Sequence, residues 1–413
     1  MKKRILMIAY HYPPLHGSSG MQRTLRFSNY LPKFGWEPIV LSAHPRAYQK
    51  TSSDQLADIS DQTIVHRAFA LDASKHFSIM SRYPRILALP DRWVTWALGA
   101  IPMGLYLIKK YKPDVIWSTY PIATAHMIGL GLNHMTGIPW VADFRDPMIR
   151  PDFQYESSVH HAYQWIENKT IKNCTRAVFT TPGAHDDYHL RFPELPSSRL
   201  SLIENGYDEE IFSKAEAITG CTPNNKRFTL VHSGVIDLSE RNPIPFFDAL
   251  SSLLKQGLIK ADTFKVILRA TCNDEYLHDL IKQYEIDPIV SLEPSIPYQE
   301  ALSEMLAADG LLILQASNCN NQIPAKLYEY LRARRPILAL TDPAGNTAKK
   351  LVSVGINTIA QLDSKQDIMQ KLIEFIKSIE NNNVQIISTD KVQRNSREFR
   401  TEELAHLLNN IKN

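Results

Sequence analysis

The sequence is poor in cysteine, and its few cysteines are far apart. The four are Cys174, Cys221, Cys272 and Cys319, and no two of them form a Cys-x-x-Cys pair. A disulfide framework or a zinc site is therefore not expected, and dispersed thiols are typical of a reducing compartment. We predict a cytoplasmic protein that holds no metal ion and no resident cofactor.

The sequence also lacks long apolar runs and a strong excess of one charge. A membrane-spanning helix needs about 18 or more consecutive apolar residues, and no such stretch is present. The formal net charge is +3, from 46 basic and 43 acidic residues that are mixed along the chain, so charge alone does not indicate a nucleic-acid partner. The apolar run at 5–9 is too short for a signal sequence and is predicted to be a buried strand.

Two widespread motifs are missing. The Gly-x-Gly-x-x-Gly fingerprint of dinucleotide-binding domains is absent, which argues against a nicotinamide-dependent oxidoreductase. No Gly-x-Ser-x-Gly turn is present, which argues against a hydrolase of that class.

What is present is an alternation of short apolar runs with amphipathic segments. This alternation predicts an α/β fold in which helices cover parallel sheets. The predicted strands are 5–9, 38–41, 114–118, 139–142, 177–180 and 200–203, followed by a second series at 228–232, 264–268, 289–292, 310–314 and 336–340. Amphipathic helices are predicted at 22–33, 243–255, 274–284 and 325–332.

The length of 413 residues favours two domains, at roughly 100–200 residues each. The series of strands is interrupted at 213–226, where a polar segment with Gly220 and Pro223 predicts a linker. We expect a first domain over 1–212 and a second over 227–389. The last helix, predicted at 396–411, would return with the tail 390–413 to the first domain.

The first predicted strand runs into a loop of small residues. Gly17, Ser18, Ser19 and Gly20 lie between this strand and the next helix. Backbone amides at such a turn, together with the partial positive charge of a helix N-terminus, can bind an anion. A flexible turn without a ligand is the alternative.

A group of charged residues ends the predicted strand at 139–142. Asp143, Arg145 and Asp146 follow it, at the sheet edge where open parallel sheets bind ligands. We predict that they are the catalytic residues. An internal salt bridge is the alternative.

Two segments of the second half predict a phosphate site. Ser233 and Gly234 end one predicted strand, and Arg241 precedes the next helix, where an arginine can hold a phosphate. The other segment contains Ile323, Pro324, Ala325, Lys326, Leu327 and Glu329. Pro324 favours a helix start. Lys326 would then lie in the first turn, where the helix dipole disfavours a cation unless an anion binds there. Glu329 would lie on the same face and could accept hydrogen bonds from a ribose diol. An ordinary surface Lys–Glu pair is the alternative.

Taken together, these motifs resemble bacterial glycosyltransferases of family four, the retaining GT-B enzymes that build cell-surface polysaccharides. The resemblance covers nearly the whole chain. Its carriers are Tyr12-Pro13-Pro14 with the loop 17–20, Asp143-Phe144-Arg145-Asp146-Pro147, Glu204-Asn205-Gly206-Tyr207-Asp208, His232-Ser233-Gly234 and the segment 324–331.

The resemblance implies two Rossmann-like domains that face each other across a cleft. The second domain would bind a nucleotide-sugar donor, with Arg241 and Lys326 on its phosphates and Glu329 on its ribose. The acceptor would be a saccharide or a lipid-linked molecule, and no metal would be needed. The chain departs from the family pattern twice, with Asn321 where many members have a glutamate and Asp143 where many have a histidine.

Two other functions stay open from the sequence. One is a sugar-nucleotide epimerase of the same fold, and the other is an inactive scaffold in a polysaccharide-assembly complex, which the residue at 321 keeps open. A further hypothesis concerns the segment 82–112, where basic residues flank an aromatic-rich apolar run. This pattern is typical of peripheral membrane contact. A helix that only covers the domain core is the alternative.

Overall fold

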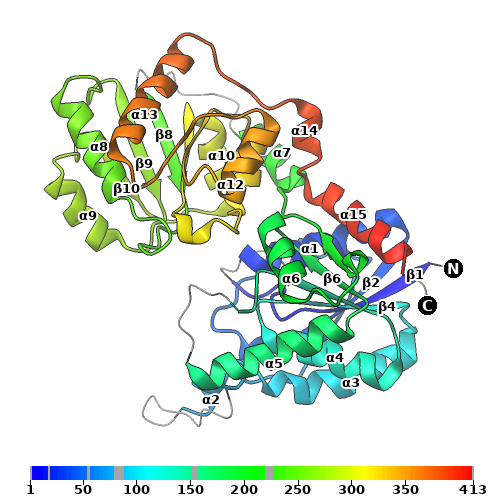
Figure 1. Ribbon diagram of the computed structural model, residues 1–413. Helices are drawn as coiled ribbons and strands as arrows, with labels where there is room; N and C mark the ends of the chain where they lie inside the picture. Colours follow the sequence, from blue (N-terminus) through cyan, green and yellow to red (C-terminus); the bar gives the residue numbers. More distant parts are fainter. Residues whose placement is uncertain are drawn as a thin grey trace. The chain divides into compact units, whose positions relative to one another are not determined.

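The computed structural model describes residues 2–16, 19–53, 56–78, 88–149, 156–218 and 227–411. The chain forms two compact units (Figure 1). Unit 1 comprises residues 1–205 and 397–413, and unit 2 comprises residues 206–396. The expected domain boundaries, 1–212 and 227–389, concern regions that fold independently, and they remain a prediction.

Unit 1 is built on a parallel sheet of seven strands in the order β3-β2-β1-β4-β5-β6-β7. The strand bounds are β1 Lys3–Ile8, β2 Trp36–Ala43, β3 Ile64–Ala68, β4 Val115–Thr119, β5 Trp140–Arg145, β6 Arg176–Phe179 and β7 Leu200–Leu202. The strand order reverses between β1 and β4. In open parallel sheets, ligands bind beyond the carboxyl ends of the strands at this kind of position.

The helices of unit 1 cover both faces of this sheet. They are α1 Ser19–Tyr30, α2 Ala73–His76, α3 Thr95–Tyr111, α4 Ala123–Thr136, α5 Ser157–Asn173, α6 Pro182–Arg191 and α15 Arg397–Asn409, with short 3-10 helices at Leu31–Phe34, Pro45–Ala47 and Ser197–Arg199. Helices α3, α4 and α5 lie side by side, and α15 packs against α1 (Figure 1). The predicted return of the C-terminal helix to the first unit is therefore confirmed.

Strand β1 shows why these apolar runs form strands. Ile5 and Met7 are buried in the core with α1 and α15, whereas Leu6 and Ile8 are buried in the opposite core with α3 and α4. A strand of a parallel sheet is covered on both faces, so its apolar residues are continuous rather than alternating.

Unit 2 contains a second parallel sheet, of six strands in the order β10-β9-β8-β11-β12-β13. The strand bounds are β8 Phe228–Ser233, β9 Phe264–Arg269, β10 Val290–Glu293, β11 Gly310–Leu314, β12 Ile337–Leu340 and β13 Ile359–Ala360. The helices are α7 Glu209–Ile218, α8 Ile244–Lys255, α9 Asp274–Gln283, α10 Tyr298–Ala307, α11 Lys326–Ala333, α12 Asn346–Val354, α13 Lys365–Glu380 and α14 Thr389–Gln393, with a 3-10 helix at Ser317–Cys319. The strand order reverses between β8 and β11, which places their carboxyl ends next to each other.

The interpretation of 213–226 as a linker is wrong for its first part. Residues 213–218 belong to helix α7, and residues 219–226 lie outside the described residues. Two features stabilise α7. Asp208 accepts a hydrogen bond from the amide of Ile211 at the start of the helix, and Phe212 and Ala215 are buried. Strands β3 and β13 were not predicted either.

Candidate functional site

The candidate site of unit 2 lies at the carboxyl ends of β8 and β11. Strand β8 ends at Ser233, and Gly234 follows in the left-handed region with φ of +109°. The chain leaves β11 through a polar loop, and helix α11 begins at Lys326. The helix start predicted from Pro324 is therefore confirmed, and it lies beside the end of β8.

Lys326 is fixed by a buried histidine. Its Nζ lies 3.1 Å from Nε2 of His232, and Nδ1 of the same imidazole lies 3.0 Å from the carbonyl oxygen of Leu312. Burial, with Lys326 nearby, holds the pKa of His232 well below its ordinary value of 6.5, so the ring is neutral. Nδ1–H therefore donates to the carbonyl, and Nε2 accepts from the ammonium group.

The ammonium group of Lys326 is electrostatically strained. The pKa of Lys326 is lowered from 10.5 to about 7, mainly by burial and in smaller part by the positive charge of Arg241, while Glu329 opposes the shift. In the described part of the chain, Lys326 has no carboxylate within ion-pair distance. A bound anion would relieve this strain, because it favours the charged form.

Gly234 leaves room for the lysine. A Cβ atom on Gly234 would lie 3.2 Å from Nζ of Lys326 and 3.6 Å from Cε. The positive φ and this close approach both require glycine at the turn. Ser233 is also fixed, since its amide donates to the hydroxyl of Tyr330 on α11 at 3.0 Å.

Arg241 lies in the loop between β8 and α8. Its amide donates to the carbonyl of Asp237 at 2.7 Å, and the carbonyl of Glu240 accepts from the amide of Ala316 at 2.7 Å. The loop is thereby joined to the end of β11. The guanidinium lies 3.6 Å from the carboxylate of Glu240. Its positive charge also acts on Lys326, so Arg241 and Lys326 are neighbouring cations at the start of α11.

Glu329 lies one turn along α11 from Lys326. Its Oε1 accepts a hydrogen bond of 2.6 Å from the hydroxyl of Tyr298 on α10. The side chain is partly exposed, so its carboxylate has capacity for further hydrogen bonds. Ile323 and Leu327 are buried and anchor the helix start, whereas Pro324 and Ala325 are the acceptors of its first turn, from the amides of Leu327 and Tyr328.

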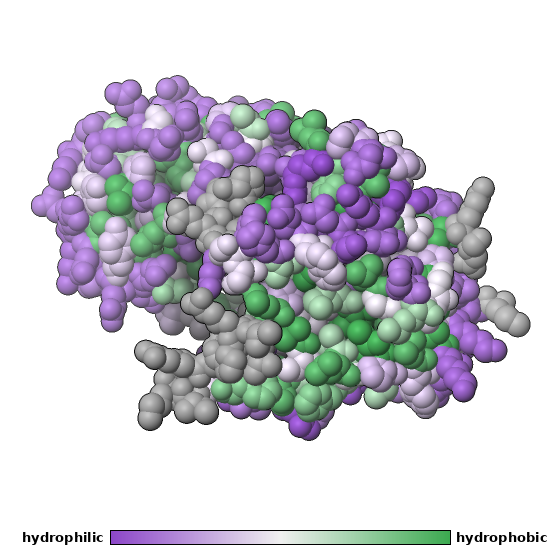
Figure 2. Space-filling model, turned by 60° about the horizontal axis from the view of Figure 1, so that its bottom comes forward, coloured by the Kyte–Doolittle hydropathy of each residue, from purple (hydrophilic) through white to green (hydrophobic). Residues whose placement is uncertain are grey.

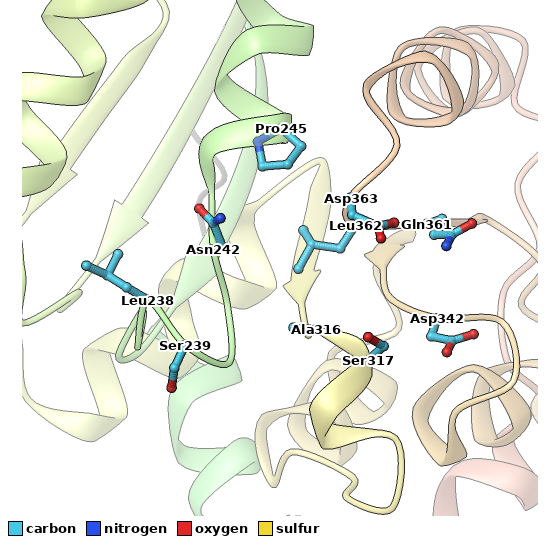
Figure 3. A pocket seen from close by; sticks show the side chains of 10 residues that line it. All are labelled: Leu238, Ser239, Asn242, Pro245, Ala316, Ser317, Asp342, Gln361, Leu362 and Asp363. Carbon is cyan, nitrogen blue, oxygen red and sulfur yellow. The ribbon is translucent and has the colours of Figure 1, made fainter. Parts of the chain in front are cut away.

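Sequence reasoning missed a pocket between the β8–α8 loop and the segments that follow β11, β12 and β13 (Figure 3). Its volume is about 260 Å³. Polar side chains from the ends of β11, β12 and β13 line it together with the loop; the lining residues are Leu238, Ser239, Asn242, Pro245, Ala316, Ser317, Asp342, Gln361, Leu362 and Asp363. The signal that could have indicated it was the position of Asp342 and Asp363, each two to three residues after a strand end.

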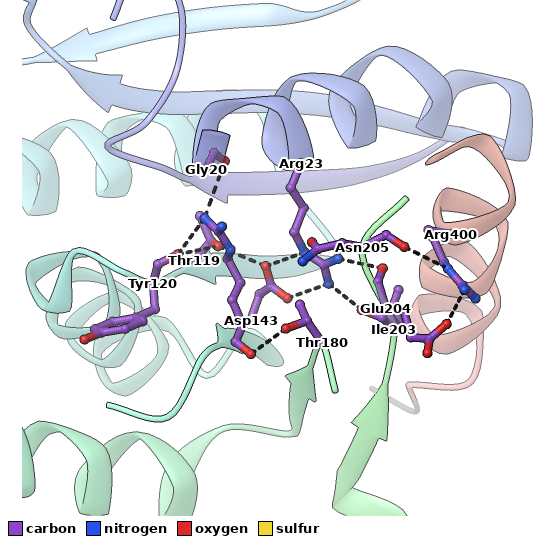
Figure 4. Close-up of polar contacts among 11 residues, drawn as sticks. Gly20, Arg23, Thr119, Tyr120, Asp143, Thr180, Ile203, Glu204, Asn205 and Arg400 are labelled. Carbon is purple, nitrogen blue, oxygen red and sulfur yellow. Dashed lines mark hydrogen bonds and ion pairs between the residues drawn. The ribbon is translucent and has the colours of Figure 1, made fainter. Parts of the chain in front are cut away.

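In unit 1, Asp143 forms a buried ion pair with Arg23 (Figure 4). Both oxygens of the carboxylate accept from the guanidinium, at 3.0 Å from Nε and 2.9 Å from Nη2, and Thr119 donates to it at 2.9 Å. Arg23 also donates to the carbonyls of Ile203 and Glu204. Asp143 is 0% exposed, so its carboxylate faces protein groups, and a role at a reacting centre stays a prediction.

Arg145 and Asp146 lie at the end of the same strand. Arg145 has φ of +59°, and its guanidinium lies near the carbonyls of Gly20 and Tyr120. Burial lowers the pKa of Arg145, which Asp146 and Asp143 oppose. Asp146 is exposed. The pKa of His11 is lowered to about 4, mainly by burial and in smaller part by the positive charge of Arg145.

The small-residue loop is only partly described. Gly17 and Ser18 lie outside the described residues, as does the side chain of Ser19. Ser19 and Gly20 form the start of α1. The loop therefore precedes a helix N-terminus, as predicted, and its anion-binding role stays a prediction.

The sequence matches a family model over part of its length. Residues 19–211 match the model described as Glycosyltransferase Family 4. No protein of curated function gives a significant match. No helix among the described residues is long and apolar enough to cross a membrane.

The fold is similar to that of several solved structures over nearly the whole chain. Sucrose-phosphate synthase from Thermosynechococcus elongatus is 12% identical with a TM-score of 0.65, and 98% of each chain is covered. Anabaena HepE in complex with UDP and glucose is 14% identical with a TM-score of 0.65, covering 99% of this chain and 100% of that chain. Trehalose-6-phosphate synthase from Burkholderia multivorans is 11% identical with a TM-score of 0.66, covering 99% and 97%. The predicted GT-B fold is confirmed.

Proposed function

We propose that this chain, which is a glycosyltransferase of family 4, transfers a sugar from a nucleotide-sugar donor to a saccharide or lipid-linked acceptor with retention at the anomeric carbon. We place the reaction in the biosynthesis of surface polysaccharide, on the cytoplasmic side of the membrane. The observation that carries the donor assignment is the pair of cations at the start of α11.

The diphosphate of the donor would bind between Arg241 and Lys326. Two neighbouring cations repel each other, and Lys326 is further destabilised by burial. A diphosphate would supply the negative charge that Lys326 lacks and would add to that of Glu240 beside Arg241, and amides at the α11 N-terminus would be donors for its oxygens. Because Gly234 has no side chain, the turn leaves space beside the ammonium group of Lys326.

The nucleoside would lie toward Glu329. The carboxylate lies one helical turn, about 5.4 Å, beyond Lys326, and Tyr298 orients it through a hydrogen bond. A carboxylate can accept from both hydroxyls of a ribose. Uridine is the first nucleoside to test, because structures of Anabaena HepE contain UDP and UDP-glucose.

The same cations would serve catalysis. When the bond between the anomeric carbon and the donor phosphate breaks, negative charge grows on the departing diphosphate. Fixed positive groups stabilise this charge in the transition state, so no metal is required. The acceptor hydroxyl would attack the anomeric carbon on the face that the diphosphate leaves and would pass its proton to the departing phosphate oxygen, which gives retention.

The proposal is tested by a thermal-shift screen against nucleotide sugars, since a ligand that binds only the native state raises its stability. The sugar nucleotide that shifts the transition is then incubated with the enzyme alone. We expect slow hydrolysis that releases the nucleoside diphosphate and a sugar whose anomer, followed by NMR, is the one in the donor. Conversion into an epimeric sugar nucleotide would instead support the epimerase, and binding without any turnover would support the scaffold.

A further inference from the structure

The outer face of three neighbouring helices in unit 1 is apolar and carries no exposed carboxylate. We call it the three-helix face; it consists of the outward side chains of α3, α4 and α5. Figure 2 shows apolar side chains gathered on the side of unit 1 that bears these helices. The large exposed ones are Leu98 and Tyr106 on α3, Met135 on α4 and Trp165 on α5, at 74, 54, 63 and 52% exposure.

Helix α3 is apolar on both sides. Its inner side is buried through Trp96, Ala100 and Leu107. The helix therefore covers the domain core, which was the alternative that the sequence left open. Its outer side presents Leu98 and Tyr106, with Pro102 exposed between them. A surface helix normally has a polar outer side, and an apolar patch of this kind marks an interaction site.

The charged side chains that α3, α4 and α5 themselves expose are all basic. Helices α3 and α4 contain no Asp or Glu, and the single carboxylate of α5, Glu167, is 0% exposed and bonded to Tyr188 and Arg191. Exposed lysines lie at the C-terminal ends of α3 and α5; they are Lys109, Lys110, Lys169 and Lys172, of which Lys172 lies 3.9 Å from the carboxylate of Glu194. Lys110 also lies over the rings of Tyr106 and Tyr111, at 5.7 and 4.8 Å.

We propose that the three-helix face binds the surface of an anionic lipid bilayer. Apolar and aromatic side chains beside lysines, with no exposed carboxylate within the three helices, match an interface of acyl chains and negative headgroups. A protein partner would normally be met by charges of both signs around an apolar centre. The face is formed by other residues than the donor site, so this proposal stands independently of the proposed function. The membrane-contact hypothesis drawn from the sequence also included the basic residues within 82–87. These lie outside the described residues.

Vesicle sedimentation tests the proposal. The full chain is mixed with vesicles of phosphatidylcholine alone or with added phosphatidylglycerol. We expect binding only to the anionic vesicles and its loss as salt rises. The double variant Lys109→Glu with Lys110→Glu should bind at least about tenfold more weakly, while Lys260→Glu with Lys282→Glu, which makes the same charge change on exposed lysines of unit 2, should bind like the wild type.

A second pair of variants tests how much the exposed apolar side chains contribute to vesicle binding. Leu98→Ser should weaken binding several-fold, whereas Leu258→Ser, at a leucine of unit 2 that is 56% exposed, should not. All four variants alter exposed side chains, so the protein should stay folded. The charge reversals place acidic residues in the last turn of α3 or α9 and should lower the unfolding temperature only slightly. Equal weakening by the test and control variants would overturn the proposal. No binding to anionic vesicles at low salt would also overturn it, as would a dimer in light scattering that Leu98→Ser dissociates without any vesicle binding.

Discussion

Nζ of Lys326 lies 3.1 Å from Nε2 of His232, and this contact defines the state of both side chains. The neutral imidazole accepts from the ammonium group, but it adds no negative charge. Lys326 is therefore oriented without being neutralised, next to Arg241. A cation that is positioned but not paired is suited to a ligand that supplies the missing charge.

Binding of a diphosphate should be linked to proton uptake. The pKa of Lys326 in the free protein is lowered to about 7, and a bound diphosphate would raise it. Affinity that depends on the charged lysine is therefore fully present below pH 7 and falls as pH rises above 7, by up to about tenfold per pH unit. Calorimetry of UDP binding at pH 8, in buffers of different ionisation enthalpy, measures the protons taken up.

Lys326→Arg is the matched variant for this linkage. Arginine keeps its charge throughout this range, so the variant should show no proton uptake from this position. If the wild type takes up no protons at pH 8, or if Lys326→Arg takes up as many, the linkage does not involve Lys326.

Gly234→Ala should impair both the turn and the site. The positive φ disfavours alanine, at a cost of about 1–2 kcal/mol in the free energy of unfolding, and the new Cβ would lie 3.2 Å from Nζ of Lys326. We expect a lower urea midpoint together with weaker UDP binding. Gly257→Ala is the control, because Gly257 also has a positive φ but has open space around its Cβ position. It should lower stability and leave UDP affinity unchanged.

Asp143→Asn should destabilise unit 1. The change leaves the guanidinium of Arg23 buried without its counter-charge, and breaking a buried pair in this way costs about 3–5 kcal/mol. Urea unfolding should show this loss. Asp146→Asn, at an exposed position of the same strand end, should unfold like the wild type. An unchanged unfolding midpoint for Asp143→Asn would show that the ion pair does not stabilise the fold.

Turnover separates the predicted catalytic roles from the structural one. If a carboxylate of this strand end lies near the reacting centre, its amide variant should reduce turnover at least about tenfold. For Asp146→Asn this loss should occur at normal stability. Near-normal turnover per folded molecule in both variants would assign Asp143 and Asp146 to structure.

Features set by local sequence were predictable. The central strands contain apolar runs because both of their faces are covered, and the start of α11 follows from Pro324 and the periodicity after it. Strand β3 was missed because its sequence, Ile64 to Ala68, includes His66 and Arg67 and lies at the sheet edge. Strand β13 has only two residues, too few for any pattern.

Contacts between distant residues could not be predicted. The pair of Asp143 with Arg23 spans 120 positions, and the contact of Lys326 with His232 spans 94. The order of strands in the sheet determines which distant residues come into contact. Apolar periodicity does not reveal this order. The sequence therefore indicated charged residues at the right strand ends, but it did not indicate that one carboxylate is buried with an arginine from α1.

The central claim is that the start of α11 binds the diphosphate of a nucleotide donor and that Glu329 binds its ribose. Calorimetric titration of the wild type and three alanine variants with UDP and with inorganic pyrophosphate tests it most directly. A charge-assisted hydrogen bond contributes about 1.5–3 kcal/mol, so each loss should weaken binding roughly ten- to a hundredfold. The account predicts that Lys326→Ala and Arg241→Ala weaken both ligands, whereas Glu329→Ala weakens UDP and leaves pyrophosphate unchanged. Wild-type affinity for UDP in the two cation variants, or equal loss of both ligands in Glu329→Ala, would contradict it.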